Sequence, residues 1–556
     1  MKSSLKHEQR KAHFFIAALL AANGLSLLLS IIYLVTNSSH GMWNLFGVLL
    51  LLTLVGNILV TLVGSNKKSL DIFYLVLTIV SMIIIPNANR AVSSDVTNTS
   101  SQSVLSIILL FYLLFLGGMI TFQKLHDLSL SKGHTKKQRA NTFPHTRSVM
   151  RFIILIFLSF ILLIGVYLAC QLVVGKGMNI VELAFPQHSL FFSFIFLSIA
   201  ALILKISSYR AKSFVKILVF STGIVLSITF SLPLLIMPFS SQNAASIYME
   251  AFGEDPKELI PVEEQNYFLS TPFMLQDYFF GIASGDYRVQ QDVLYYEGRT
   301  GVDTGILLHF DVYMPPADQA DLPGNHSVLV RIHGGGWTAG DKGSSNNAQV
   351  NKYFASQGYV VFDVQYGLSH EDKLFALSKV PENIVGGFTI DDMVRHLGIF
   401  TDYLVEHGGE YEANLDSVFI SGGSAGGQLA IAVGLGLAGG QIDYLNPRLN
   451  VKGIIPVYPA NGLSKIVEVE GSEELTDPSF FVTEDSPPAL IYQGTHDGVV
   501  NQSVAIKFDQ TYKERGSSNS ALILMPFAGH SSNLYFPGYY NQVFLYYMER
   551  FMYQFK

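Results

Sequence analysis

The chain has 556 residues, of which 49% are hydrophobic and only 14% are charged, whereas an average soluble globular chain carries about 25% charged residues. Residues 1–238 hold 19 Lys and Arg against 5 Asp and Glu, a net charge of +14, and residues 239–556 carry a net charge of −21. This division excludes a single uniform soluble domain. We expect an apolar, basic N-terminal region followed by an acidic globular one.

Seven apolar runs of the N-terminal region are long enough to cross a bilayer, which takes roughly 17–25 residues. They lie at about 13–35, 42–64, 70–86, 103–123, 150–174, 188–206 and 214–238. The first run is too long for the core of a secretory signal peptide and lacks a convincing cleavage site, so we expect it to remain as an anchor. The sequence therefore predicts an all-α transmembrane bundle of about seven helices over residues 1–238.

The basic residues of this region predict its orientation, because inner loops of membrane proteins carry an excess of Lys and Arg. With the N-terminus inside, 17 Lys and Arg fall on inner segments, and only Arg90 and Lys176 fall on outer ones. We therefore expect a multi-pass protein of the plasma membrane with a cytoplasmic N-terminus and an extracellular acidic domain. The span interiors hold almost no ionisable residues, which favours an anchor or scaffold over transport, with an acyl-handling or lipid-binding role left open.

From about residue 286 the sequence changes to short β-branched or aromatic runs that alternate with amphipathic segments. Runs such as "HSVLVRIHGGG" and "PALIYQGTHD" are typical of strands that end in turns, and "DDMVRHLGIFTDYLVEHG" is typical of a helix. This alternation predicts a mostly parallel sheet covered on both faces. We expect a catalytic domain over 286–556, joined to the bundle by a linker or partial cap over 239–285.

The segment "SGGSAGGQLA" contains a G-x-S-x-G motif centred on Ser424. In this motif the serine sits on a strained turn between a strand and a helix, which lifts its hydroxyl clear of the sheet. The flanking Gly422 and Gly426 are needed because side chains there would collide across the turn. The apolar runs before and after the motif supply the strand and the helix, so Ser424 is a candidate nucleophile.

A second glycine-rich turn, "RIHGGGW", follows a predicted strand about ninety residues upstream. It consists of His333, Gly334, Gly335 and Gly336, followed by Trp337. This HGGG pattern resembles the oxyanion-hole loop of lipases and esterases. Residues without side chains let backbone N–H groups point at a developing negative charge.

A serine nucleophile needs a base, and the base needs an orienting carboxylate. Asp497 in "YQGTHDGVV" and His530 in "MPFAGHSSN" each come directly after a predicted strand. The chain order Ser, Asp, His is that of α/β hydrolases. His496 and His370 are competitors for the base, but neither follows the last strand, and Asp363 lies within an earlier strand, where we expect a structural role.

Residues from roughly 290 to 556 resemble the carboxylesterase branch of the α/β-hydrolase superfamily, which includes hormone-sensitive-lipase-like and feruloyl-esterase-like enzymes. The stretches "HGGGWTAGDK", "SGGSAGGQLA", "GTHDGVV" and "AGH" match its pattern in order and spacing. The resemblance implies an α/β-hydrolase fold with Ser424 as nucleophile, His530 as general base and Asp497 as the residue that orients it.

The same resemblance implies that the backbone amides of Gly335, Gly336 and Ala425 form the oxyanion hole. One residue departs from the pattern, because many hormone-sensitive-lipase-like members have Asp before the nucleophile, where this chain has Gly423. This departure favours the feruloyl-esterase-like side and leaves the substrate open. The N-terminal membrane region lies outside the resemblance.

No motif indicates a cofactor. The G-x-G-x-x-G at Gly434, Gly436 and Gly439 lies in or after a predicted helix instead of opening one after a strand, which disfavours a dinucleotide site. The sequence contains no H-E-x-x-H and no C-x-x-C, so it does not support a zinc site. The basic loop at 124–151 is typical of a topology signal that attracts anionic lipid, so we expect no cofactor, no metal and no nucleic-acid partner.

These patterns favour a membrane-anchored serine carboxylesterase that hydrolyses small or envelope-associated esters, such as acyl groups on a glycan or lipid, with membrane lipid around its anchor. An acyltransferase that passes the acyl group from the same serine to an envelope alcohol is the first alternative. A non-catalytic receptor on a hydrolase scaffold is the second, and the presence of a complete candidate triad disfavours it.

Overall fold

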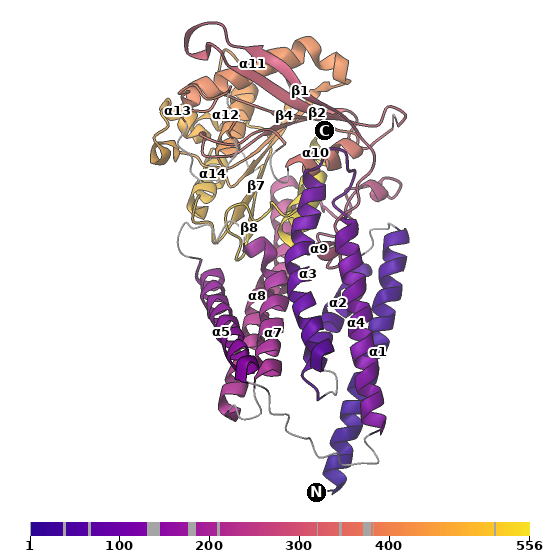
Figure 1. Ribbon diagram of the computed structural model, residues 1–556. Helices are drawn as coiled ribbons and strands as arrows, with labels where there is room; N and C mark the ends of the chain where they lie inside the picture. Colours follow the sequence, from indigo (N-terminus) through magenta and orange to yellow (C-terminus); the bar gives the residue numbers. More distant parts are fainter. Residues whose placement is uncertain are drawn as a thin grey trace.

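The structure, a computed structural model, has a helical region with a sheet domain stacked on one end of it (Figure 1). The residues that it describes are 2–36, 41–64, 68–130, 145–175, 185–207, 212–319, 321–343, 347–370, 380–381, 383–515 and 519–556. Residues 131–144 of the basic loop at 124–151 lie outside these residues, as does Lys176.

Among the described residues, seven long helices form the helical region, and all of them are long and apolar enough to cross a membrane, judged by length and composition. They are α1 (Lys2–Thr36), α2 (Trp43–Thr61), α3 (Lys68–Ser94), α4 (Val104–Leu130), α5 (His145–Val174), α7 (Ser189–Ile206) and α8 (Ser213–Phe252). This confirms the seven predicted helices, although α8 continues fourteen residues past the predicted end of its span at 238. The N-terminus lies at the end of the bundle far from the sheet domain (Figure 1).

Three charged side chains are buried together at this far end of the bundle. Asp71 of α3 forms ion pairs with Lys124 of α4 at 3.1 Å and with Lys205 of α7 at 2.6 Å. Lys124 Nζ also donates to the carbonyl oxygen of Val63, just past α2, at 2.7 Å. Asp71 and Lys205 lie one residue inside the ends of their predicted spans and Lys124 lies one residue beyond its span, so the cluster stands at the span ends rather than in their interiors.

The sheet domain contains eight strands in the order β1-β2-β4-β3-β5-β6-β7-β8. Pairs β1–β2 and β2–β4 are antiparallel and all the others are parallel. The strands are β1 (Arg288–Glu297), β2 (Leu307–Met314), β3 (Ser327–Ile332), β4 (Val360–Val364), β5 (Asn414–Gly423), β6 (Val451–Val457), β7 (Ala489–Gly494) and β8 (Ser520–Met525). This order and the mostly parallel pairing are those of the α/β-hydrolase fold, as predicted.

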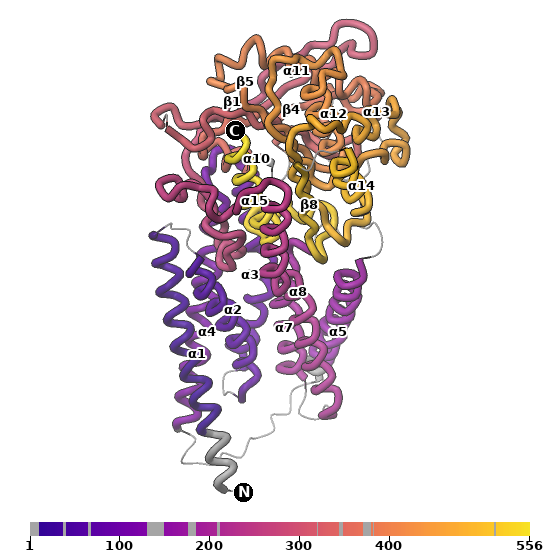
Figure 2. Tube along the Cα trace, turned by 180° about the vertical axis from the view of Figure 1, so that it is seen from behind, coloured from indigo at the N-terminus to yellow at the C-terminus, as the bar shows by residue number. Residues whose placement is uncertain are grey.

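Helices cover both faces of the sheet, which explains why every residue of β3 and β4 is buried. One apolar core packs α11 (Ile390–His407) and α12 (Ala425–Gly439) against the sheet. The opposite face packs against α10 (Asn347–Ser356) and α15 (Tyr539–Phe555). This second core continues without a break into the helical region, with α15 behind the sheet near α8 (Figure 2). α13 (Glu473–Thr476) and α14 (Gln502–Glu514) complete the domain.

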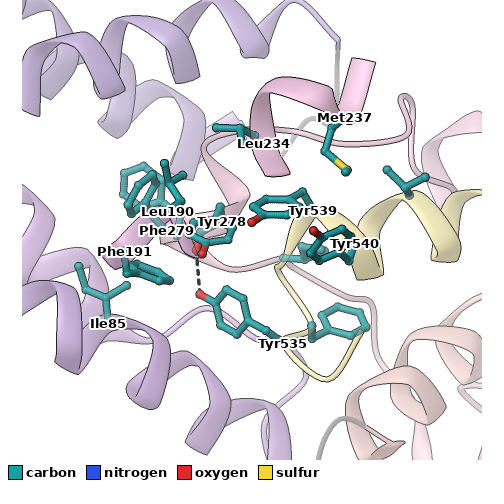
Figure 3. Packing of buried hydrophobic residues seen from close by; sticks show 14 of the residues in the cluster. Ile85, Leu190, Phe191, Leu234, Met237, Tyr278, Phe279, Tyr535, Tyr539 and Tyr540 are labelled. Atoms are coloured by element: carbon teal, nitrogen blue, oxygen red, sulfur yellow. Dashed lines mark hydrogen bonds between the residues drawn. The ribbon is translucent and has the colours of Figure 1, made fainter. Parts of the chain in front are cut away.

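The segment expected to be a linker or partial cap packs between the helical region and the sheet domain. Its short helix α9 (Asp277–Phe280) is fully buried, and Tyr278 and Phe279 lie among side chains of α3, α7 and the chain before α15 (Figure 3). Glu549 of α15 accepts hydrogen bonds from Leu269 N at 2.8 Å and from Tyr353 Oη at 2.7 Å. The part of the segment around α9 therefore belongs to the core shared by the helical region and the sheet domain.

Candidate active site

Ser424 occupies the turn between the end of β5 and the start of α12. Its backbone has φ 58° and ψ −122°, a conformation that costs a non-glycine residue about 1–3 kcal/mol. Its N–H donates to Val457 O of β6 at 2.9 Å, and its carbonyl oxygen accepts from Gly427 N at 2.9 Å and Gln428 N at 3.1 Å. These bonds hold the strained turn, and they leave the partly exposed serine at the carboxyl edge of the sheet.

The glycines on either side of Ser424 leave no room for side chains. A Cβ on Gly422 would lie 2.1 Å from the carbonyl oxygen of Gly426, and a Cβ on Gly426 would lie 2.2 Å from that of Ile332. At Gly423, by contrast, the nearest atom to such a Cβ is a ring carbon of Tyr458 at 3.4 Å. The turn therefore tolerates a side chain at 423 but not at 422 or 426.

The HGGG loop after β3 passes directly beside the serine. A Cβ on Gly334 would lie 2.4 Å from the carbonyl oxygen of Gly423 and 3.2 Å from Ser424 Cβ. Beyond it, Gly335 and Gly336 have φ of 138° and 63°, values that favour glycine. The backbone of this loop therefore approaches the serine as closely as packing allows.

Three amides at this place are the candidate oxyanion-hole donors. In the part of the chain that the structure describes, no hydrogen bond is recorded from the N–H groups of Gly335, Gly336 or Ala425. Ala425 is the first residue of α12, so helix geometry itself leaves its N–H unpaired. Unpaired N–H groups beside a hydroxyl are suited to bind negative charge.

Two aromatic contacts fix the HGGG loop. The His333 ring stacks on Tyr366 with 4.4 Å between ring centroids, and Tyr366 Oη donates to His333 O at 2.9 Å. Trp337 Nε1 donates to Gln428 Oε1 of α12 at 2.9 Å. Burial lowers the pKa of His333, so this histidine supports the loop as a neutral side chain.

Asp497 and His530, which follow β7 and β8, lie against each other. Asp497 Oδ2 and His530 Nδ1 are 2.8 Å apart, and both side chains are buried. The carboxylate also accepts from Val499 N at 3.0 Å and Val500 N at 2.8 Å through Oδ1, and from Gln493 Nε2 at 3.1 Å through Oδ2. These hydrogen bonds fix the orientation of the carboxylate.

Tyr458, after β6, connects the serine turn to His530, and sequence analysis missed it. Its ring centroid lies 4.4 Å from that of His530, and the same ring borders Gly423, next to the serine. Tyr458 Oη donates to Asn533 Oδ1 at 3.0 Å. The only available signal was its position at the carboxyl end of a predicted strand, "GIIPVYP", which it shares with many structural residues.

The competitors for catalytic roles have partners elsewhere. His370 Nε2 lies 3.1 Å from Val467 O, and His496 Nε2 lies 3.1 Å from Val173 O of α5. Asp363 is buried and accepts from Gly343 N and from the Asn351 side chain, each at 2.8 Å. Burial raises the pKa of Asp363 to about 6, and its partners connect β4 to the chain around α10.

A cavity of about 410 Å³ lies between the helical region and the sheet domain, apart from these residues. Tyr33 of α1 and Asp277 line it, and Tyr33 Oη donates to Asp277 Oδ1. Burial raises the pKa of Asp277 to about 7. Among the described residues, no three His, Cys, Asp or Glu side chains are grouped so as to hold a metal ion.

Comparison with known proteins finds a family match within the sheet domain. The family model described as BD-FAE matches residues 310–473, a segment that contains Ser424 and the HGGG loop but ends before Asp497 and His530. The chain is 22% identical over 273 residues to a probable carboxylic ester hydrolase, LipM, of Mycobacterium tuberculosis. This match covers 45% of the chain and 57% of LipM, so it spans little more than half of that protein.

Two solved structures of Thermogutta terrifontis esterase 2 are similar at low identity. The apo form is 21% identical, covers 48% of this chain and 90% of its own, and has a TM-score of 0.36. The butyrate-bound form is 22% identical, covers 43% and 84%, and has a TM-score of 0.34. The strand order of the sheet domain is that of the α/β-hydrolase fold, and its residues 310–473 are similar to the BD-FAE family.

Proposed function

We propose that this chain is a membrane-anchored serine carboxylesterase. The observation that carries the proposal is the pair of Asp497 and His530, whose Oδ2 and Nδ1 atoms are 2.8 Å apart. The ring of Tyr458 packs against His530 and also borders the turn of Ser424. The HGGG loop beside the serine supplies the other element that ester hydrolysis needs. The family match and the LipM relative support the same class of reaction.

In the proposed mechanism Ser424 Oγ attacks the ester carbonyl carbon while His530 takes its proton. Asp497 stays ionised, holds the imidazole in the required tautomer and stabilises its positive charge. His530 then gives the proton to the departing alcohol oxygen as the ester C–O bond breaks and the acyl-enzyme forms. Water attacks the acyl-enzyme by the same route and releases the carboxylic acid and the free serine.

The negative charge on the carbonyl oxygen is balanced by the amides of Gly335, Gly336 and Ala425. One such donor lowers the barrier by about 2.7–4 kcal/mol. Because the strained turn of Ser424 and the packed HGGG loop are already in place, little reorganisation is needed at the moment of reaction.

We place the protein in the plasma membrane, with the N-terminus in the cytoplasm and the sheet domain outside the cell. Seven apolar helices support the membrane placement. The excess of basic residues on the segments at the end of the bundle that holds the N-terminus supports this orientation. Envelope-associated carboxylic esters are then the accessible substrates.

The test is labelling of the full-length protein by a fluorophosphonate probe, together with turnover of a panel of esters. Ser424→Ala should abolish labelling and lower turnover by about 10⁴-fold or more, while Ser503→Ala, at an exposed position of α14, should behave as the wild type. Product analysis with an added alcohol distinguishes hydrolysis from acyl transfer. A folded protein that is neither labelled nor active on any ester would contradict the proposal.

A further inference from the structure

The loop that carries Asp497 rests on the end of a membrane-type helix. His496, the residue before Asp497, has its Nε2 3.1 Å from the carbonyl oxygen of Val173, one residue before the end of α5. Gly175 also leaves no room for a side chain beside this ring, since a Cβ there would lie 2.1 Å from Cδ2 of His496. The end of α5 and the catalytic loop are therefore in direct van der Waals contact.

The loop that carries His530 rests on two other helices of the same region. Tyr535 Oη accepts a hydrogen bond from Asn89 Nδ2 of α3 at 3.2 Å and donates to Tyr278 O at 2.7 Å. Its ring also lies 6.0 Å, centroid to centroid, from that of Phe191 in α7, and Figure 3 shows these rings packed together. The loop that carries Asp497 and the loop that carries His530 are thus both fixed at the level where the helices end.

This level corresponds to the headgroup layer of a bilayer. The apolar part of α5 runs from Val149 to Val174, 26 residues, which as a helix spans about 39 Å. That length covers the hydrocarbon core of about 30 Å and reaches into the polar layer on either side. Because the backbone of Val173 contacts His496, a bilayer around these helices would bring the layer that holds the lipid ester carbonyls beside the loop that carries Asp497.

The helix at this place is itself open to lipid. Only 28% of the apolar window of α5 is buried inside the protein, against 78% for the span that contains α7. α5 stands at the margin of the bundle (Figure 1), and its exposed side chains are large and apolar, including Phe157, Phe160 and Tyr167. Lipid can therefore pack along α5 up to its contact with His496.

We propose that the substrate is a lipid-borne carboxylic ester of the leaflet next to the sheet domain, which reaches Ser424 beside the end of α5. This inference rests on the proposed function and narrows its substrate class. Water adds across the ester C–O bond, so that the acyl group leaves as a carboxylic acid and the other oxygen as an alcohol, and the lipid tail keeps at least one product in the membrane.

The experiment uses the full chain reconstituted in vesicles of phosphatidylethanolamine and phosphatidylglycerol. The vesicles carry a fluorogenic diacyl lipid ester, and parallel samples receive a water-soluble short-chain ester with the same reporter group. We expect the bilayer ester to be turned over about tenfold faster or more, because the membrane positions its carbonyl at the triad. Turnover of the soluble ester with normal fluorophosphonate labelling, but no turnover of the bilayer ester, would overturn this inference and leave the proposed function standing. Absence of labelling and of all turnover would instead overturn the proposed function.

A variant at the end of α5 tests the position of entry. Gly175→Ala should separate the helix from His496 and lower the ratio of bilayer to soluble turnover by about tenfold. Gly440→Ala is the matched control, because Gly440 has nearly the same φ, 62° against 59°, but nothing within 4 Å of an added Cβ. An unchanged ratio in the Gly175 variant would contradict entry beside α5.

Discussion

The carboxyl edge of the sheet and the helical region beneath it depend on different kinds of interaction. At the edge a few residues have fixed positions, such as Ser424 in its strained turn and Asp497 with its several donors. In the helical region, buried polar groups pair across helices, as Asn23 of α1 and Asn57 of α2 do with two reciprocal hydrogen bonds of 2.8 Å. We therefore expect changes at the edge to act mainly on rate and changes in the helical region mainly on stability.

Asp497→Asn should lower the rate most while leaving stability almost unchanged. An amide at this position would present its NH₂ group to His530 Nδ1 and favour the wrong tautomer, so that kcat falls by about 10⁴-fold. Thermal unfolding should stay close to that of the wild type, because the shape of the side chain is kept. Asp416→Asn, at an exposed position, serves as the control, and a kcat within tenfold of wild type in the Asp497 variant would contradict the assignment.

Gly422→Ala is expected to affect both rate and stability, because the turn and its strand are one structure. The added Cβ would lie 2.1 Å from a backbone oxygen, which we expect to cost about 1–3 kcal/mol of stability and, by moving Ser424, about 100-fold in kcat. Gly423→Ala is the neighbouring control and should be close to wild type in both. Equal behaviour of the two variants, measured by turnover and thermal unfolding, would argue against the close approach at 422.

Asp71→Asn should lower stability without changing the chemistry. It leaves Lys124 and Lys205 buried without their shared carboxylate, and breaking a buried ion pair costs about 3–5 kcal/mol. Thermal unfolding of the full chain in detergent measures this, and kcat per folded molecule should be unchanged. Glu254→Gln, at an exposed position past α8, is the control. A wild-type melting temperature would show that the cluster carries no stability.

Asp277→Asn should remove a smaller, pH-dependent part of the stability. Burial raises the pKa of Asp277 to about 7, whereas an unfolded aspartate has a pKa near 3.9. The folded state therefore binds the proton more tightly, and the free energy of unfolding falls as the pH rises from about 4 to about 7. We expect the Tm of the wild type to fall more than that of the variant between pH 5 and pH 8. Parallel Tm profiles would contradict a neutral carboxyl in the folded protein.

The candidate site residues could be proposed from the sequence because each belongs to a local pattern. The turn of Ser424, the HGGG loop, Asp497 and His530 all follow strands that are recognisable from their own residues. Parallel strands bring such ends to one edge. The fold class and the seven helices were predictable for the same reason, since length and periodicity are properties of short segments.

Partners that are distant in sequence could not be predicted in this way. Asp71 and Lys124 pair across 53 residues, and Tyr33 and Asp277 across 244. No feature of either sequence segment indicates which distant residue it will contact. Tyr458 was missed because the contacts that place it in the site are with the loop of His530 and the turn of Ser424. Its own neighbours in the chain do not indicate these contacts.

The contacts of α15 with α8 have a consequence for biosynthesis. Tyr248 Oη donates to Gln554 Oε1, and Tyr547 Oη donates to Ser241 O, in both cases across 306 residues. At about 5–20 residues translated per second, the part of α8 that has left the ribosome has no α15 to pack against for roughly 15–60 s. During that interval the aromatic side chains that contact α15 in the folded protein are exposed. If elongation stalls, we expect them to bind chaperones or to be recognised by a protease.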